Sequence, residues 1–395
     1  MKKVIIVLAG IFLAFGIFYF LKFPRFDAKK NVPTPIKPKL EKTIYNFLLL
    51  GYGGGVHDGT YLTDTMMVAH IDTKIKKVTL FSIPRDLWVK LSTKSGADFH
   101  TKINAVYQLE LFPKNYPDLD QKYMGTLDDA SLIKTVVTQI TGLPIDGYVS
   151  IDFQGFTKAV DILGGIDVNI EKSFIDSEYP IDGKEKDLCG QDEIFKKAEP
   201  YIIPPFDSAE RQNKFAEDPK IEEFARNATS TPELAFPCRY EKLEFKKGVT
   251  HMDGATALKY ARSRHSGTDG GDFNRARRQQ QIIEAVKDKV LTIGFLPKII
   301  PLINEFQKDI KTDIGLDVIK KFISIADKTK EYKINTFVIS DQNVLKNAVS
   351  DDRQYILISK EGKDSWNEVK KLISDTIIGV TPTPIASASA TLKSK

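Results

Sequence analysis

Side chains that could grip phosphate are concentrated in one stretch of this sequence, residues 260–280. It reads Tyr-Ala-Arg-Ser-Arg at 260–264 and Asp-Phe-Asn-Arg-Ala-Arg-Arg-Gln-Gln at 272–280. A planar guanidinium group binds phosphate oxygens through paired hydrogen bonds, so two converging pairs would suit a diphosphate. The side chains expected to point the same way are Arg262 and Arg264, if that segment is extended, and Arg275, Arg278 and Gln279 on a helix.

Two other interpretations of this stretch compete with phosphate binding. A basic helix face in contact with solvent is common, and a nucleic-acid-binding surface also uses arginines. The second is disfavoured because aromatic residues that could stack on bases do not alternate with these arginines. The charge balance agrees, since 57 basic residues face 52 acidic ones and the net charge is only +5. We therefore expect no nucleic-acid partner.

A second group of polar residues lies at the predicted ends of two neighbouring strands. Asp64 stands in Leu-Thr-Asp-Thr at the start of one strand, and Arg85 stands in Ser-Ile-Pro-Arg-Asp at the end of the next. If the strands form a hairpin, both side chains lie at the same end of the sheet. A carboxylate beside a phosphate-binding arginine can hold Mg²⁺, which prefers oxygen ligands; a plain ion pair is the alternative. Lys102, in Lys-Ile-Asn-Ala, follows closely enough to line the same site.

A glycine-rich turn follows the first predicted strand and reads Gly-Tyr-Gly-Gly-Gly-Val-His-Asp-Gly at 51–59. Such a turn lets backbone amides approach a phosphate group. It is neither a P-loop nor a dinucleotide-binding fingerprint, because the residues that define those motifs are absent. His57 is expected to be a turn residue rather than a ligand.

The elements that must position these residues alternate between strands and helices. Apolar, β-branched runs predict strands at 44–50, 65–71, 77–82, 147–152, 166–170 and 333–340. Helical patterns predict helices at 131–141, 153–163, 255–261, 274–291, 318–326 and 365–378. This order predicts an α/β fold, with α/β/α layers built on a central mixed sheet.

One polar, proline-rich stretch, residues 173–247, breaks this alternation and is predicted to be an insertion with helix of its own near 208–229. It holds both cysteines of the chain, Cys189 and Cys238. In an exported domain two cysteines more often form a disulfide than a metal site. No histidine lies between them, so zinc would lack ligands. We expect a disulfide that closes a surface insertion.

The chain begins with a candidate membrane anchor. After the short start at 1–3, an unbroken apolar run at 4–21 has the length of a membrane-spanning helix. Bulky residues at its end make a poor cleavage site, which favours an uncleaved signal-anchor over a cleaved signal peptide. Residues 22–40 predict a stiff Lys/Pro-rich linker, and 380–395 predict a disordered tail. The folded part, 41–379, is expected to lie outside the cell membrane.

Together these segments resemble the LytR-CpsA-Psr family of cell-wall glycopolymer phosphotransferases over residues 45–378, nearly the whole predicted folded part. The motifs that carry the resemblance are Thr-Asp-Thr at 63–65, Ser-Ile-Pro-Arg-Asp at 82–86, Lys-Ile-Asn-Ala at 102–105, Val-Ser-Ile-Asp-Phe-Gln-Gly-Phe at 149–156, Leu-Gly-Gly-Ile-Asp-Val at 163–168, and the runs at 253–264 and 272–280. Each motif is modest alone, and their joint occurrence is specific.

The resemblance implies an extracellular enzyme on a single membrane span that attaches a glycopolymer to peptidoglycan. The glycan would come from a polyprenyl-pyrophosphate carrier, polyprenyl phosphate would leave, and Mg²⁺ would be the cofactor. A hydrophobic tunnel would hold the acyl chain; 149–156, 160–163 and 282–290 could line it or be ordinary core.

The resemblance also implies roles for individual residues. The pyrophosphate would be bound by Arg85, Arg262, Arg264, Arg275 and Gln279, with Lys102 and Arg278 beside them. Asp64 would hold the metal, and Asp272 would orient an arginine or act near the acceptor hydroxyl. We expect Asp64, Arg85, Arg264 and Asp272 to form the catalytic set.

The sequence departs from the family pattern around its glycine-rich turn. Many members carry an aspartate where this chain has Gly53, often as a second metal contact, and an arginine where it has Tyr61 and Leu62. Asp58 or His57 is the candidate to replace the missing ligand. Two other functions would use the same residues. One is a polyprenyl pyrophosphate hydrolase, with water as the acceptor, and the other is a non-catalytic wall-associated regulator that binds anionic polymers.

Overall fold

The structure is a computed structural model that describes residues 42–55, 59–120, 130–202, 209–290, 310–315, 318, 321–322 and 332–379. The chain divides into two compact units. The first, the sheet unit, comprises Met1–Val168, His251–Leu258 and Ala276–Lys395. The second, the hairpin unit, comprises Asn169–Thr250 and Lys259–Arg275.

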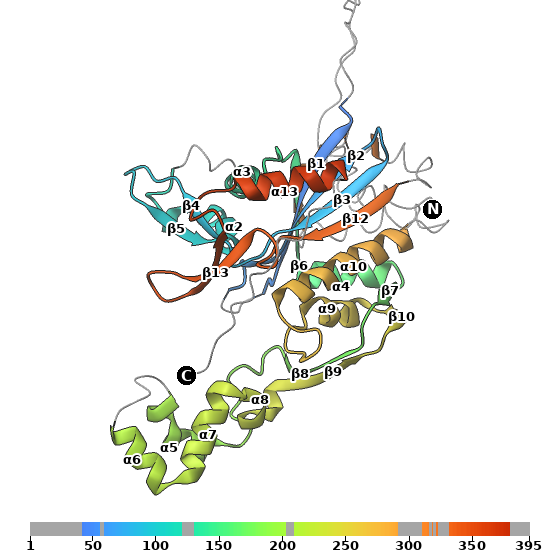
Figure 1. Cartoon of the computed structure of the whole chain (residues 1–395). Coiled ribbons are helices and arrows are strands. Elements are labelled where there is room, and N and C mark those ends of the chain that lie inside the picture. Colours follow the sequence, from blue (N-terminus) through green and yellow to red (C-terminus); the bar gives the residue numbers. More distant parts are fainter. Residues whose placement is uncertain are drawn as a thin grey trace, which may run out of the picture. The chain divides into compact units, whose positions relative to one another are not determined.

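The sheet unit is built on a six-stranded mixed sheet with the order β11-β6-β1-β2-β3-β12 (Figure 1). β1 pairs in parallel with β6 and antiparallel with β2, and β3 pairs antiparallel with β2 and in parallel with β12. This confirms the predicted α/β class and the predicted hairpin after residue 72. The strands are β1 (Ile44–Tyr52), β2 (Thr63–Asp72), β3 (Lys77–Ser82), β6 (Gly147–Asp152), β11 (Ile310–Thr312) and β12 (Lys333–Val338).

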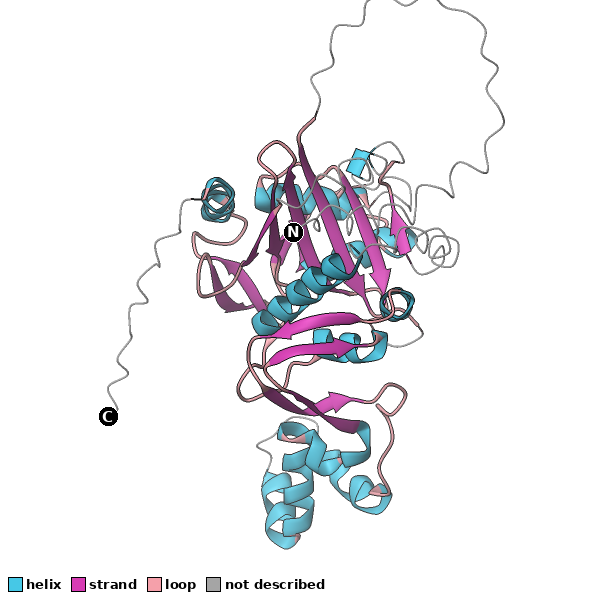
Figure 2. Ribbon diagram, turned by 90° about the vertical axis from the view of Figure 1, so that its right-hand side faces the viewer, coloured by secondary structure: helices cyan, strands magenta, loops and turns pink. Residues whose placement is uncertain are grey.

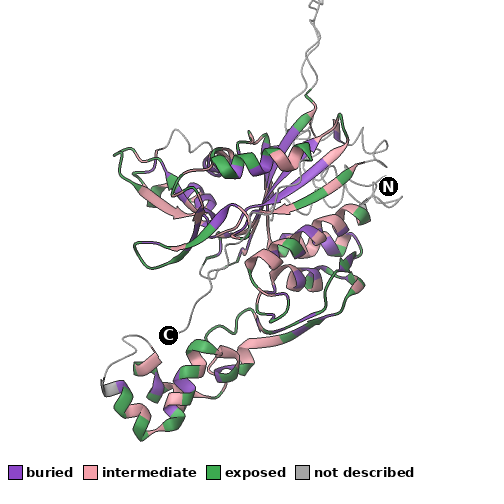
Figure 3. Cartoon of the chain, viewed as in Figure 1, coloured by how far each residue is buried: buried purple, intermediate pink, exposed green. Residues whose placement is uncertain are grey.

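β1 lies inside the sheet because its sequence is apolar on both faces. Phe47, Leu48 and Leu50 are all buried, as expected for a strand that has helices on both sides. Tyr45 and Phe47 pack edge-to-face against Phe322, with ring centroids 5.1 and 5.8 Å apart. Figure 3 shows how strongly burial is concentrated in these strands.

Helices cover both faces of the sheet. One side carries α2 (Ile103–Leu111), α3 (Ser131–Thr141) and α13 (Asn367–Ile378), and the other carries α4 (Phe153–Ile162) and the part of α10 (Asp272–Val290) that belongs to this unit (Figures 1 and 2). α3 ends as predicted at Gly142, whose φ of 73° suits a residue without a Cβ. α4 begins after Asp152, whose carboxylate accepts a hydrogen bond from the Gly155 amide.

Several short strands were not predicted, because a run of four or five residues seldom has a clear period. They include those of two small antiparallel sheets that pair β4 (Trp88–Leu91) with β5 (Phe99–Lys102) and β13 (Leu345–Val349) with β14 (Tyr355–Ser359). The predicted strand β7 (Ile166–Ile170) pairs with β10 (Gly248–Met252), and α9 spans Gly254–Arg262. A 3₁₀ turn, η1, covers Pro113–Asn115.

The predicted membrane span at 4–21 lies outside the described residues, as do the predicted linker and tail. Among the residues that the structure does describe, there is no helix with the length and apolar character needed to cross a bilayer.

A histidine is buried in the sheet unit, where β2 meets β1. His70 is only 6% exposed, and its Nδ1 lies 2.7 Å from the side-chain oxygen of Asn46. Burial lowers the pKa of His70 below its usual value of 6.5, because the interior disfavours the charged ring; Asp72 opposes this shift and Lys77 adds to it. The folded protein therefore holds this ring neutral more firmly than the unfolded chain does.

We expect the free energy of unfolding of the sheet unit to fall as the pH drops below 6.5. The unfolded chain then takes up a proton at His70 before the folded chain does, so the loss can reach about 1.4 kcal/mol for each unit by which the pKa is lowered. Urea unfolding at pH 7.5 and 5.5 should show a smaller loss in His70→Asn, which does not titrate. Equal losses in both proteins would contradict this assignment.

The hairpin unit is organised by an antiparallel pair of strands, β8 (Phe174–Pro180) and β9 (Tyr240–Phe245). The whole segment between them emerges from the end of this hairpin, where the Ile181 amide donates to the Arg239 carbonyl across 2.8 Å. That segment carries α5 (Asp192–Ile202), α6 (Ala209–Glu217), α7 (Pro219–Ser230), α8 (Pro232–Ala235) and a 3₁₀ turn, η3 (Pro237–Arg239). We call residues 181–239 the helical insertion.

The helical insertion is more helical than the sequence suggested. The helix expected near 208–229 is divided into α6 and α7, because Asp218 caps a new helix and Pro219 occupies its first turn. Its small core contains Ala198, Ile221, Phe224, Ala235 and Phe236. α5 was missed altogether; Pro200, which usually interrupts a helix, lies inside it.

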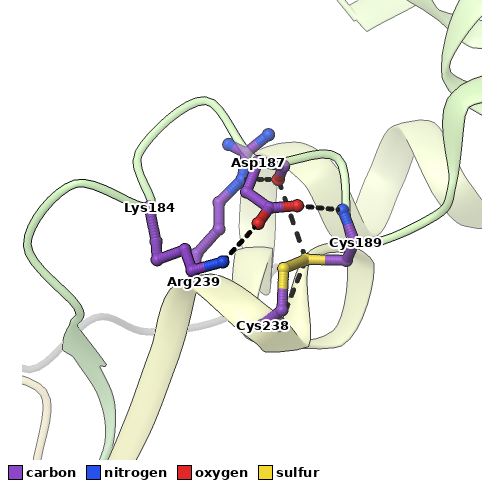
Figure 4. The surroundings of a disulfide bond; sticks show 5 residues. All are labelled: Lys184, Asp187, Cys189, Cys238 and Arg239. Atoms are coloured by element: carbon purple, nitrogen blue, oxygen red, sulfur yellow. Dashed lines mark hydrogen bonds and ion pairs between the residues drawn. A yellow bond between two sulfur atoms is a disulfide. The ribbon is translucent and has the colours of Figure 1, made fainter.

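A disulfide between Cys189 and Cys238 ties the base of the helical insertion together, as predicted (Figure 4). The Cα atoms are 5.5 Å apart and the sequence separation is 49 residues. Asp187 supports the link, because its carboxylate accepts from the Cys189 amide and its backbone carbonyl accepts from Arg239 Nε.

Reducing this disulfide should destabilise the helical insertion by about 2–4 kcal/mol, because the open chain regains the entropy of a long loop. The sheet unit contains no part of the link, so its own unfolding transition should not move. Protease cleavage mapped by mass spectrometry, with and without reductant, would check this. Cleavage that spread equally into β1 and β2 would show that the link supports more than the insertion.

Candidate functional site

An alternating row of charges lies at one end of the sheet, between the start of β2 and the start of α2. Arg85 Nη1 contacts Asp64 Oδ1 at 2.6 Å, and Arg85 Nε lies 3.5 Å from Asp86 Oδ2. Lys102 Nζ reaches the other oxygen of Asp86 at 2.6 Å. The structure therefore brings Asp64, Arg85 and Lys102 together as the sequence suggested, with Asp86 as an added link.

Backbone hydrogen bonds hold the loop that carries Arg85 against α2. The amide of Ile103 donates to the carbonyl of Leu87, and the amide of Asn104 donates to the carbonyl of Arg85, across 2.8 and 3.2 Å. Thr63, at the start of β2, donates its hydroxyl to the carbonyl of Asn104. The chemistry-bearing side chains thus project from a backbone that three separate segments fix in place.

Asp86 is the residue of this row for which no role was predicted from the sequence. Its side chain is 9% exposed, whereas those of Arg85 and Lys102 are 22% and 23% exposed. A nearly buried carboxylate between two cations reduces their mutual repulsion and lets both remain at the edge of the sheet. The only sequence signal for it was its position directly after Arg85.

The sheet-unit part of α10 is docked beside this row by a second residue that sequence reasoning missed. Gln280 donates from Nε2 to the Ser82 hydroxyl at 2.8 Å and to the Phe337 carbonyl at 3.0 Å. Ser82 ends β3, immediately before the loop with Arg85. The neighbouring Gln279 is half-buried, and Arg278 is only 2% exposed. Arg278 is thus much more deeply buried than Arg85. The predicted contact of Arg278 with phosphate stays a prediction.

In the hairpin unit, one carboxylate connects two of the predicted arginines. Arg264 approaches Asp272 with two nitrogens, Nε at 3.1 Å from Oδ1 and Nη2 at 3.2 Å from Oδ2. Arg275 Nη2 contacts the same Oδ1 at 3.0 Å. Asp272 therefore aligns two guanidinium groups, which matches the orienting role rather than direct work on an acceptor. The Arg264 side chain remains 34% exposed.

Arg262 does not share an extended segment with Arg264. It is the last residue of α9, whereas Arg264 lies beyond the end of that helix. Its guanidinium group lies 5.5 Å from the centre of the Tyr179 ring and 3.5 Å from Asp182 Oδ1. Burial raises the pKa of Tyr179 to about 12, even though Arg262 opposes the rise, so this phenol stays protonated at any physiological pH.

The described part of the glycine-rich turn packs against the start of α4. A Cβ on Gly54, whose φ is +70°, would lie 2.9 Å from the Cβ of Asp152. Asp152 is the last residue of β6 and pairs with Tyr52 of β1. On the other side of β1, Tyr52 pairs with Thr63 of β2, the residue before Asp64. Asp152 is thus a second carboxylate near this edge of the sheet. His57 and Asp58 lie outside the described residues.

These carboxylates have the oxygen ligands that Mg²⁺ prefers. Among the described residues, Asp187, Cys189 and Cys238 form the one cluster of possible ligands whose atoms lie close enough to share an ion. Both of its sulfur atoms belong to the disulfide, so they are not thiolate ligands. In ligand chemistry, the residues at the sheet edge fit Mg²⁺ better than this cluster does.

Comparison with known sequences identifies relatives over most of the chain. The protein is 27% identical over 254 residues to TagV of Bacillus subtilis, named a polyisoprenyl-teichoic acid–peptidoglycan teichoic acid transferase; the match covers 64% of this chain and 45% of TagV. It is 22% identical over 334 residues to TagU of Enterococcus faecalis, which bears the same transferase name, covering 82% and 81%. Biofilm regulatory protein A of Streptococcus mutans is 23% identical over 395 residues, covering 93% and 76%.

Solved structures show the same fold. The crystal structure of B. subtilis TagV superposes with a TM-score of 0.52 at 22% identity, and the match covers 87% of this chain and all of that one. An E. faecalis structure titled as a transcriptional regulator gives a TM-score of 0.50 at 19% identity. At these identities the likeness speaks for the fold alone. A family model described as the LytR_cpsA_psr family matches residues 25–371. The chain therefore belongs to the LytR-CpsA-Psr family.

Proposed function

We propose that this protein transfers a glycopolymer from a polyprenyl-pyrophosphate carrier to peptidoglycan and releases polyprenyl phosphate. The observation that carries the proposal is the row Asp64–Arg85–Asp86–Lys102, which places two partly exposed cations at the end of a rigid sheet. Membership of the family supports it, as do the transferase names of the relatives TagV and TagU. We further propose a single N-terminal membrane span with the folded part outside the cell.

The reaction is a displacement at phosphorus. The acceptor hydroxyl oxygen bonds to the phosphorus next to the glycan, the bond from that phosphorus to the bridging oxygen breaks, and the bridging oxygen leaves with polyprenyl phosphate. Arg85 and Lys102 would bind phosphate oxygens and stabilise the charge that develops there. Arg262, Arg264, Arg275 and Gln279 keep the phosphate-binding role that the resemblance implies. The acceptor hydroxyl proton passes to solvent or to a nearby carboxylate.

We propose that Asp64 of β2 holds Mg²⁺, with Asp152 of β6, on the far side of β1, as a second carboxylate at this edge of the sheet. When bound, the ion would neutralise part of the pyrophosphate charge. Asp64 and Arg85 are already in contact, so the arginine would help to orient the carboxylate that holds the ion.

A second candidate function is a wall-associated regulator that binds anionic polymers without catalysis. The relative whose match covers 93% of this chain is named a biofilm regulatory protein, which supports this second candidate. Such a protein would bind polyanions equally well with Asp64 replaced by Asn, because its cations alone would carry the binding.

The test uses the full chain in detergent with a glycan-linked polyprenyl pyrophosphate, in the presence and absence of peptidoglycan. Mass spectrometry of the lipid and of the digested wall separates the functions. Glycan on the wall together with polyprenyl phosphate supports the transferase. Phosphorylated glycan released without a wall acceptor indicates a hydrolase, and binding without any turnover indicates the regulator.

A further inference from the structure

A single buried carboxylate organises the backbone around Arg264. Asp176 lies in β8 and is fully buried. Its Oδ2 accepts three hydrogen bonds: from the Ser263 hydroxyl at 2.6 Å, from the Arg264 amide at 2.9 Å and from the His265 amide at 3.1 Å. The chain between α9 and α10 therefore folds its amides around one oxygen atom that is 88 residues away from Arg264.

The other oxygen of Asp176 belongs to the strand that presents it. Oδ1 accepts from the Glu178 amide at 3.0 Å, and the β8–β9 register shifts between Asp176 and Tyr179. The strand that carries Asp176 therefore also holds the second oxygen of its carboxylate. Burial alone would raise the pKa of Asp176, but the hydrogen bonds from Ser263, Glu178, His265 and Arg264 outweigh it and lower the pKa. The anion is fully satisfied in place.

The backbone of Arg264 is restrained on both sides. Its amide is held by Asp176, and its carbonyl accepts from the Gly271 amide at 2.8 Å. A Cβ on Gly270 would lie 2.7 Å from that carbonyl oxygen, so the loop closes tightly over this residue. From this restrained backbone the side chain reaches Asp272, which contacts it through two nitrogens.

We infer that Asp176 is a positioning residue that sets the direction of Arg264 for binding the substrate pyrophosphate. It acts through hydrogen bonds to the backbone and touches no substrate. The inference rests on the proposed function, because it assumes that Arg264 binds phosphate. An ionised carboxylate is required, since only acceptors can face four donors at once.

Asp176→Asn tests the charge with little change in size. In asparagine an NH₂ group replaces one carboxylate oxygen and therefore faces at least one of the donors that this oxygen accepted from. Two donors cannot pair, so the turn shifts. We expect affinity for farnesyl pyrophosphate, used as a short probe, to fall on the order of tenfold. Ser263→Ala removes one donor and keeps both amide contacts, so it should lose less. Asp218→Asn is the matched control, because asparagine also caps a helix well, and should bind normally.

A double-mutant cycle separates positioning from general damage to the fold. The full chain in detergent is titrated with farnesyl pyrophosphate as wild type, Asp176→Asn, Arg264→Ala and the double variant, below the unfolding transition of each. If Asp176 acts through Arg264, the double variant binds about as weakly as Arg264→Ala alone. The inference is overturned if the fold-losses in affinity of the two single variants multiply in the double variant. It is also overturned if Asp176→Asn binds normally. Unchanged binding by Arg264→Ala would instead refute the phosphate-binding role on which it rests.

Discussion

Arg85→Ala should lower the rate of glycan transfer by about 10²–10³-fold, the usual cost of removing one donor that stabilises developing charge. The variant should remain folded, because the side chain lies at the sheet edge and the loop is held by backbone hydrogen bonds from Ile103 and Asn104. The loss also leaves Asp64 and Asp86 without their shared cation, which makes the site more negative and repels a pyrophosphate. Transfer to peptidoglycan, followed by mass spectrometry, measures the effect.

Two further variants define what Arg85 contributes. Arg85→Lys keeps the charge but loses the paired hydrogen bonds, so its rate should lie between those of the wild type and Arg85→Ala. Arg226→Ala, in the exposed pair with Glu222 on α7, removes an arginine of the helical insertion to which the proposed reaction gives no role, and should keep full activity. If Arg85→Ala retained wild-type turnover, the row at the sheet edge would not be the reaction site.

Gly254→Ala should lower the free energy of unfolding of the sheet unit by about 3 kcal/mol, at the upper end of the cost of overpacking. A Cβ at this position would lie 2.1 Å from the carbonyl oxygen of Thr157 and 2.7 Å from its carbonyl carbon. Both are backbone atoms of α4, so no side chain can rotate away. The Gly254 amide also donates to Asp161 at 2.7 Å, which any separation of α9 from α4 would break.

The matched control is Gly267→Ala, where an added Cβ would meet no atom within 4 Å. It should change stability only slightly, and in the stabilising direction if at all, because alanine restricts the unfolded chain more than glycine. Denaturant unfolding of both variants, followed by tryptophan fluorescence, gives the comparison. Equal midpoints would contradict the close contact between α4 and α9.

Elements with a clear period could be predicted from the sequence almost to the residue. β3 and α3 begin and end where expected, because β-branched runs and an amphipathic pattern that stops at glycine are unambiguous. β4 and β5 were missed because four residues carry no usable period. The helical insertion was only recognised as an interruption, since its helices are polar and depend on a small core and a disulfide for their stability.

The candidate site shows the same division. Arg85 and Lys102 could be predicted because their residue types are suited to phosphate and their positions flank a strand pair. Gln280 and Asp176 could not, because each acts through partners 198 and 87 residues away that no local pattern reveals. A buried glutamine or aspartate has no recognisable pattern in a single sequence, because the fold alone determines which donors and acceptors it meets.

The hydrogen bond between the Ile181 amide and the Arg239 carbonyl brings the two ends of the helical insertion together. Because its ends meet, the segment can be exchanged as one cassette. A chain without it would need only a tight turn between β8 and β9. The same property is useful in the laboratory. A short turn, a fluorescent domain or an affinity label can replace residues 182–238 while the flanking strands keep their register.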